Sequence, residues 1–182
     1  MITLLALNGT MFVVELITGW HAESMGLIAD GLDMGADAAV YLLALLAIGS
    51  SAAHKLQAAR FAGRVQLTLA VVAIVEVGRR AFMGSSPETP IMVGISLAAL
   101  AVNIGCLALL RRHRHGEVHL QAAWVFSATD VQANLGVLAA ALLVDAFHSA
   151  IPDIAIGAAI CWLVLRGALR IQQKVRAAEA AT

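Results

Sequence analysis

Charged side chains are scarce in this chain of 182 residues. Asp, Glu, Lys and Arg together make up 13% of the residues, whereas hydrophobic residues make up 60% and the mean hydropathy is +0.85. A soluble domain usually carries roughly 25% charged residues. This scarcity of charge excludes a soluble globular domain and predicts a polytopic membrane protein.

Cysteine is also rare, and the motifs of soluble enzymes are missing. Cys106 and Cys161 lie within hydrophobic runs, where a free Cys behaves as a small apolar residue, so we expect both to pack rather than to bind metal. The sequence contains no nucleotide-binding loop, zinc-finger spacing or nucleophile elbow. We therefore expect no enzyme activity, no resident cofactor and no nucleic-acid partner.

Six hydrophobic runs are long enough to cross a bilayer as helices, which takes about 17 to 25 residues each. The first run is too long, and lacks the basic start, for a cleaved signal peptide, so we expect it to remain as a helix. The sequence predicts an all-α, six-helix transmembrane domain over residues 1–172 and a short polar tail over residues 173–182. The predicted spans are residues 2–20, 25–49, 62–82, 91–110, 120–144 and 151–172.

Basic residues are divided unevenly between the two ends of this predicted bundle. Six helices place both termini on one side, and only Arg79 and Arg80 fall on the other side. The side with the termini holds the other ten of the twelve basic residues, namely Lys55, Arg60, Arg64, Arg111, Arg112, Arg114, Arg166, Arg170, Lys174 and Arg176. Because cytoplasmic loops carry the excess of Lys and Arg, we expect both termini in the cytoplasm and the helices in the cell (inner) membrane.

Three carboxylates interrupt the second hydrophobic run. Asp30, Asp33 and Asp37 are three and four residues apart, so they share one face of a helix. A carboxylate facing lipid costs at least about 2.5 to 3.5 kcal/mol, and this run contains no Lys or Arg to pair with it. The acids are therefore predicted to face the bundle interior and to bind a metal ion or protons.

Other residues of the first two runs support a polar interior. Asn8 and Glu15 lie seven residues apart in the first run, on nearly one helix face, and Glu15 is another intramembrane acid. In the second run, Gly26, Gly31 and Gly35 are small residues that allow a neighbouring helix to approach closely.

The fifth run places Phe126, Asp130 and Asn134 four residues apart on one face. Inward carboxylates on two helices can neutralise a divalent cation as its water is removed, and protons can replace the cation when the site is empty. Binding metal on one side and protons on the other is a mechanism of exchange by alternating access.

Histidines cluster between the fourth and fifth runs. His113, His115 and His119 lie beside Glu117, and neutral imidazoles near a carboxylate can capture a transition metal in the cytoplasm. The alternative interpretation is a basic loop next to the membrane whose histidines are incidental.

Two further acids and one amide receive structural interpretations. Asp153 lies in the first turn of the sixth run, where the helix dipole favours a negative charge. Glu76 can be neutralised by Arg79 and Arg80 at i+3 and i+4. Asn103 is expected to hydrogen-bond a neighbouring helix.

The run S-x-x-L-x-x-D-x-x-D-x-x-x-D, formed here by Ser24, Leu27, Asp30, Asp33 and Asp37, resembles the second helix of the cation diffusion facilitator family. In that family a His or Asp followed four residues later by Asp forms half of the transport site. The resemblance implies that Asp33 and Asp37 are metal ligands. Asp30 lies one turn away and is a candidate for helix packing or, together with Asn134 and Glu15, for a metal or proton pathway.

The fifth helix of the family supplies the other half of the site, usually His and, four residues later, Asp. Asp130 matches the Asp, but Phe126 stands where the His is expected and cannot bind metal. Water, Asn134 or Ser127 would then complete the site. All-oxygen ligands favour zinc less than imidazole does and leave manganese, ferrous iron or cobalt open.

The resemblance also implies efflux of a divalent metal from the cytoplasm in exchange for protons, with zinc as the first candidate and cadmium among the others. Most family members end with a soluble metal-binding domain that helps dimerisation, whereas this chain stops some ten residues after the sixth run, so we expect any homodimer to form through the helices. One alternative is a degenerate member that binds or senses metal without transport. A remote alternative is an intramembrane enzyme using Asp37 and Asp130 as acid and base, although the G-x-G-D element of such proteases is missing.

Overall fold

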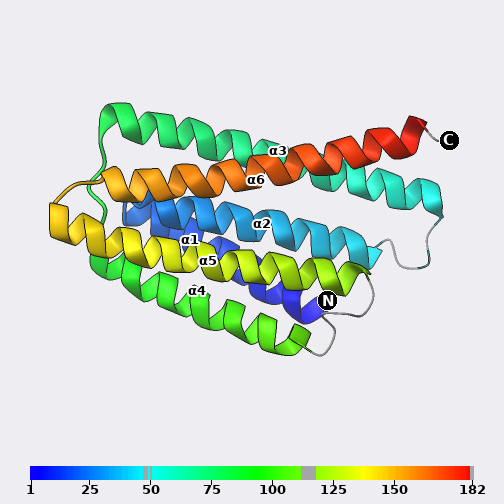
Figure 1. Ribbon diagram of the computed structural model, residues 1–182, viewed down its shortest axis with the longest axis horizontal. Helices are drawn as coiled ribbons and strands as arrows, with labels where there is room; N and C mark the ends of the chain where they lie inside the picture. Colours follow the sequence, from blue (N-terminus) through cyan, green and yellow to red (C-terminus); the bar gives the residue numbers. More distant parts are fainter. Residues whose placement is uncertain (47–48, 50, 112–117, 181–182) are drawn as a thin grey trace.

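The computed structural model describes residues 1–46, 49, 51–111 and 118–180, and these residues form helices with short connections (Figure 1). The helices are α1 (Ile2–His21), α2 (Met25–Leu46), α3 (Ala52–Met83), α4 (Thr89–Leu110), α5 (Val118–Phe147) and α6 (Ile151–Ala180). No strand occurs in the described part of the chain. The predicted all-α class is confirmed.

The helices form one bundle with α2 at its centre. They run alternately in opposite directions, so that both termini lie at the same end (Figure 1). Helix α2 packs against each of the other five helices, most extensively against α1, α3 and α6, while α3 pairs with α6 and α4 with α5. The helix that carries the three acids is thus the one most enclosed by protein.

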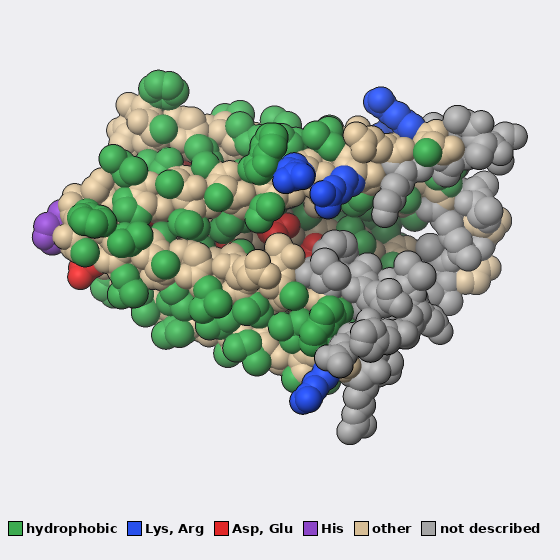
Figure 2. Space-filling view, viewed as in Figure 1, with side chains coloured by type: hydrophobic (Ala, Val, Ile, Leu, Met, Phe, Trp, Pro, Cys, Tyr) green, Lys and Arg blue, Asp and Glu red, His purple; other side chains and the backbone are tan. Residues whose placement is uncertain are grey.

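Five of the six helices are long and apolar enough to cross a membrane, judged by length and composition. Helix α2 is not among them because its three Asp residues fall within any stretch of sufficient length. Its 22 residues nevertheless extend about 33 Å, which matches the thickness of a bilayer core. Large apolar side chains such as Phe82 and Leu142 point outward from the other helices, and hydrophobic groups cover much of the surface in Figure 2. These features confirm a polytopic membrane protein.

Helix α3 is longer than the hydrophobic run that predicted it. It begins at Ala52, ten residues before the predicted span, and Ser51 caps it by accepting a hydrogen bond from the backbone N–H of His54 at 3.4 Å. Hydropathy marks only the lipid-facing part of a helix, whereas residues 52–61 are rich in Ala, Lys, Gln and Arg, which are strong helix formers. For the same reason α6 continues to Ala180, through the stretch expected to be a polar tail.

Glycines allow close packing on α2, as the sequence predicts. A Cβ atom added at Gly31 would lie 3.0 Å from the Cβ of Glu15, and one added at Gly35 would lie 2.7 Å from the ring of Phe12. Both contacts bring α1 close to the face of α2 next to the acids. Gly26 provides the same close approach for α5 and α6.

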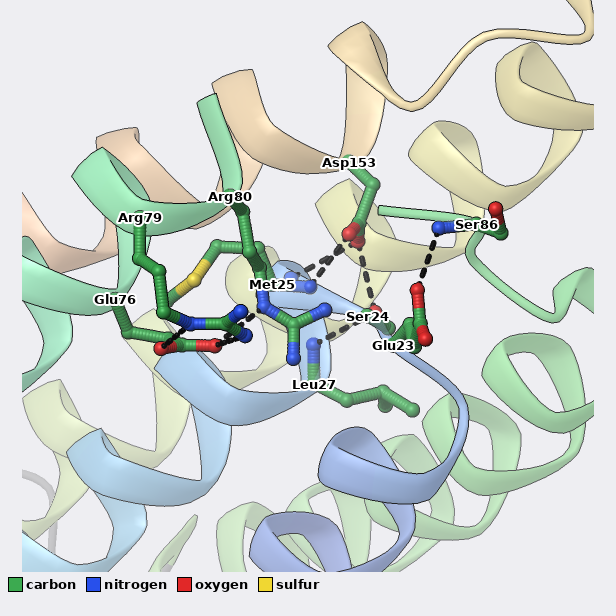
Figure 3. Close-up of polar contacts among 10 residues, drawn as sticks. Glu23, Ser24, Met25, Leu27, Glu76, Arg79, Arg80, Ser86 and Asp153 are labelled. Atoms are coloured by element: carbon green, nitrogen blue, oxygen red, sulfur yellow. Dashed lines mark hydrogen bonds and ion pairs between the residues drawn. The ribbon is translucent and has the colours of Figure 1, made fainter. Parts of the chain in front are cut away.

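Asp153 of α6 caps the start of α2, at the end of the bundle opposite the termini (Figure 3). Its carboxylate accepts hydrogen bonds from the hydroxyl of Ser24 at 2.8 Å and from the backbone N–H groups of Met25 and Gly26. Ser24 in turn accepts a hydrogen bond from the N–H of Leu27 at 3.2 Å. The sequence predicted a structural role for Asp153 at its own helix, but the carboxylate also satisfies the first N–H groups of another helix.

The predicted neutralisation of Glu76 is confirmed at the same end of the bundle (Figure 3). Arg79 donates two hydrogen bonds to its carboxylate, at 2.7 and 2.6 Å, and Arg80 donates a third at 2.7 Å. The Arg79 guanidinium also lies 5.9 Å from the ring centre of Trp20, which connects α3 with α1. This network joins α3 to α1 at the end of the bundle opposite the termini.

Candidate metal centre

The three acids of α2 point into the bundle because their spacing follows the helical period. Asp30 and Asp37 are buried and Asp33 is partly buried. Asp130 of α5 is 1% exposed, and its Oδ2 atom makes no hydrogen bond within the described residues. Four carboxylates from two helices are therefore removed from lipid, as the sequence predicts.

Three of these carboxylates line one cavity of about 220 Å³. The polar side chains of its wall are Asp33 and Asp37 of α2, Gln66 of α3, Thr129 and Asp130 of α5, and Arg166 and Arg170 of α6. Figure 2 shows acidic atoms inside a hollow on this face of the molecule, directly beside basic side chains. The structure thus brings together, in one space, the two acids of α2 and the acid of α5 that the sequence singled out.

The carboxylates of the cavity repel one another. Asp37 is close enough to Asp33 and Asp130 for their charges to interact, and Asp37 and Asp130 are buried. Such a group is stable only when protons or a cation neutralise it. The arrangement can therefore exchange a divalent cation for protons.

The described residues contain no set of three His, Cys, Asp or Glu side chains that already converges on one point as a metal cluster. Asp33, Asp37 and Asp130 share a cavity without surrounding a single position. Direct coordination by these three side chains remains a prediction. A carrier that alternates between two states would draw them together only in one of those states.

Asp30 belongs to a neighbouring polar group and not to the wall of the cavity. Asn134 donates a hydrogen bond from Nδ2 to Oδ2 of Asp30, and Glu15 of α1 lies next to this pair. Asp30, Asn134 and Glu15 are all fully buried. The structure therefore groups the three residues that the sequence assigned to a metal or proton pathway.

Several predicted residues cannot be compared with the structure. His113 and His115 lie outside the described residues. His119 and Phe126 belong to α5, but their side chains also lie outside the described part of the chain. Ser127, which follows Phe126, is fully buried. Capture of metal by the histidines and the effect of Phe126 remain predictions.

Gln66, Arg166 and Arg170 are cavity residues that sequence reasoning missed. Gln66 lies in a stretch expected to span the membrane and carries no charge, and it donates a hydrogen bond to the backbone carbonyl of Val164 at 3.5 Å. The two arginines were assigned only to the positive side of the membrane. Their spacing of four residues on one helix face is the signal that indicates a paired role.

The expectation that the acids of the second run have no Lys or Arg to pair with requires a correction. It holds for α2 itself, but α6 contributes Arg166 and Arg170 to the same cavity. Neither arginine forms an ion pair with an acid in the ranges that the structure describes. Basic side chains therefore share the cavity without neutralising the carboxylates directly.

Comparison with known proteins places this arrangement in a family. Residues 1–175 match the model of the cation efflux transmembrane domain. The chain is 27% identical over 183 residues to the zinc transporter ZitB of Yersinia pestis and 24% identical over 186 residues to the metal cation efflux system protein CzcD of Cupriavidus metallidurans. These matches cover 91% and 92% of this chain, but only 57% and 59% of the relatives. The chain belongs to the cation diffusion facilitator family of cation efflux proteins.

Proposed function

We propose that this protein exports a divalent metal cation in exchange for protons through the cavity lined by Asp33, Asp37 and Asp130. The observation that carries the proposal is the meeting of carboxylates from α2 and α5 in one cavity inside a membrane bundle. Ionised carboxylates bind the metal on one side of the membrane, and protons replace it on the other side. The protein is a transporter and not an enzyme in this proposal.

Zinc is the first candidate for the transported ion. One relative is named as a zinc transporter and another as a metal cation efflux protein. Because the cavity offers carboxylate and amide oxygens, manganese, ferrous iron, cobalt and cadmium are also candidates. The accumulation of basic residues at the end with both termini supports a cytoplasmic position for that end in the cell (inner) membrane. Any homodimer would then form through the lipid-facing helices.

Asp30 and Glu15 are proposed to carry protons between the cavity and the opposite end of the bundle, with Asn134 holding the Asp30 carboxylate by its hydrogen bond. All three are buried on the side of Asp33 nearer the start of α2. Buried carboxyl groups in series are typical of proton relays in transporters. This assignment explains why acids outside the cavity remain inside the bundle.

Metal-dependent proton flux in liposomes tests the proposal. The purified chain should move zinc against a proton gradient, and Asp37→Asn and Asp130→Asn should each abolish the movement. Asp145→Asn is the matched control, because Asp145 is an exposed acid of α5 and should transport normally. Lack of flux for zinc, cadmium, cobalt, manganese and iron alike, or equal flux in all variants, would reject the transport function.

The same flux measurement, combined with a measurement of metal binding, distinguishes a transporter from a degenerate family member. A chain that binds these metals tightly but moves none of them would be a binding or sensing protein. Phe126→His addresses this alternative, because restoring the imidazole of the family should raise zinc affinity if position 126 faces the site.

A further inference from the structure

Arg166 and Arg170 occupy an unusual position for basic residues of a membrane helix. Both lie within Ile151–Ala177, the part of α6 that contains a stretch apolar enough to span a membrane. An arginine within the bilayer core costs about 2.5 to 3.5 kcal/mol or more when it faces lipid, so on such a helix it turns towards a polar cavity or towards an opposite charge. The carboxylate cavity provides both within the reach of these side chains, since both line it.

The packing of α6 on α2 brings the arginines level with the acids. The two helices begin at the same end and run in the same direction (Figure 1). A Cβ atom added at Gly157 would lie 2.9 Å from the carbonyl oxygen of Met25, so these residues mark a shared level. At the same rise per residue, Asp33 is level with residue 165 and Asp37 with residue 169. Arg166 therefore lies about one residue beyond the level of Asp33 along the helix axes, and Arg170 lies about one residue beyond the level of Asp37.

The charges of the cavity nearly cancel without a metal ion. Three ionised carboxylates and two guanidinium groups leave one net negative charge, because arginine stays protonated at every physiological pH. A bound divalent cation would make the same cavity positive. The positive charges of the arginines therefore oppose metal binding.

We propose that Arg166 and Arg170 are built-in counter-charges of the transport cavity, which offset part of its negative charge without pairing with the acids and repel an incoming metal ion. Both side chains line the cavity but make no ion pair with a described residue, so their positive charges act on the acids and on the metal through the space of the cavity. The proposal rests on the proposed function, since the carboxylates are taken as the metal site. Repulsion between the arginines and the metal ion adds a free-energy cost to metal binding and so lowers the affinity of the site.

Zinc and cobalt(II) binding to the purified full chain, measured by isothermal titration calorimetry, tests the proposal. Arg166→Gln and Arg170→Gln should each tighten binding roughly three- to tenfold, because a repelling charge is removed from the cavity. Arg64→Gln is the matched control, since Arg64 is exposed on α3, next to the cavity residue Gln66 but outside the cavity wall, and it should leave the affinity unchanged.

A second measurement follows the metal-free protein in chelator. Loss of a counter-charge leaves the carboxylates to repel one another, so Arg166→Gln and Arg170→Gln should lower Tm, whereas Arg64→Gln should not. In an Asp37→Asn background both effects of Arg170→Gln should shrink, because the partner charge is gone.

These outcomes distinguish the two proposals. If the wild-type chain binds neither ion, the proposed function fails, and the Tm comparison still decides whether the arginines stabilise the acids. If the wild type binds metal but Arg166→Gln and Arg170→Gln leave both affinity and metal-free Tm as in the control, the counter-charge proposal is overturned while the metal site stands.

Discussion

Two polar regions of this bundle differ in whether their buried acids have hydrogen-bond or ion-pair partners. At the end opposite the termini, Asp153 accepts three hydrogen bonds and Glu76 is paired with two arginines. In the cavity, Asp37 and Asp130 repel each other, and the arginines nearby do not pair with them within the described residues. Satisfied polar groups hold a structure together, whereas unsatisfied buried charges indicate a site for a mobile ligand.

The largest expected effect is on transport and comes from a substitution in the cavity alone. Asp130→Asn should lower metal flux in liposomes at least about 100-fold, because a ligand that neutralises the ion is lost. The same substitution should leave Tm unchanged or raise it, because it removes one of the three carboxylates that repel one another in the cavity. A fall in Tm of the size expected for Asp153→Ala would show that Asp130 is structural.

The next largest effect is expected on stability, from the loss of the hydrogen bonds that Asp153 accepts at the end of the bundle opposite the termini. Asp153→Ala should destabilise the protein by about 3 kcal/mol, because the hydroxyl of Ser24 and two N–H groups of α2 lose their acceptor. Thermal unfolding in detergent measures the change, with Asp145→Ala as the exposed-acid control. An equal Tm for both variants would contradict the capping role.

A third effect on stability is expected from a change in the packing of α1 against α2, next to the acids. Gly31→Ala should cost about 1 to 3 kcal/mol, since the added methyl would meet the Cβ of Glu15 at 3.0 Å. Gly105→Ala is the control on α4, where nothing lies within 4 Å of an added Cβ. Thermal unfolding should show a loss for the first variant alone, and equal stability would mean that α1 and α2 separate without cost.

A smaller change in affinity concerns the chemistry of the cavity. Phe126→His, one turn before Asp130, should strengthen zinc binding roughly tenfold and manganese binding less, because imidazole favours zinc. Calorimetric titrations with both ions measure the ratio. No change in either affinity would show that position 126 does not face the site.

The smallest effect on Tm is expected from the exposed arginine of the group that neutralises Glu76. Arg79→Ala should change Tm little, because Arg79 is exposed and Arg80 continues to neutralise Glu76. Thermal unfolding compared with Arg80→Ala measures the contrast, because Arg80 is 2% exposed and its loss removes a buried partner. Equal losses for the two arginines would contradict this ranking.

Local patterns were sufficient to predict much of the fold and part of the candidate site. Hydrophobic runs predicted six helices, and the spacing of Asp30, Asp33 and Asp37 predicted that they face inward. Runs of hydropathy did not locate the start of α3 at Ala52, because a helix continues through charged residues beyond the lipid. Contacts within one helix, such as that of Glu76 with Arg79, follow from the helical period and were also predictable.

The sequence by itself determined which residues are expensive to expose to lipid, and so that the acids of α2 and α5 must lie inside. Only the tertiary structure decided which groups share the interior with them. Asp153 reaches the start of α2, and Arg166 and Arg170 reach the carboxylate cavity, because the packing of α6 against Gly26 and Met25 sets its register along α2. That register depends on side chains of different helices fitting together, and no periodicity within a single helix contains it.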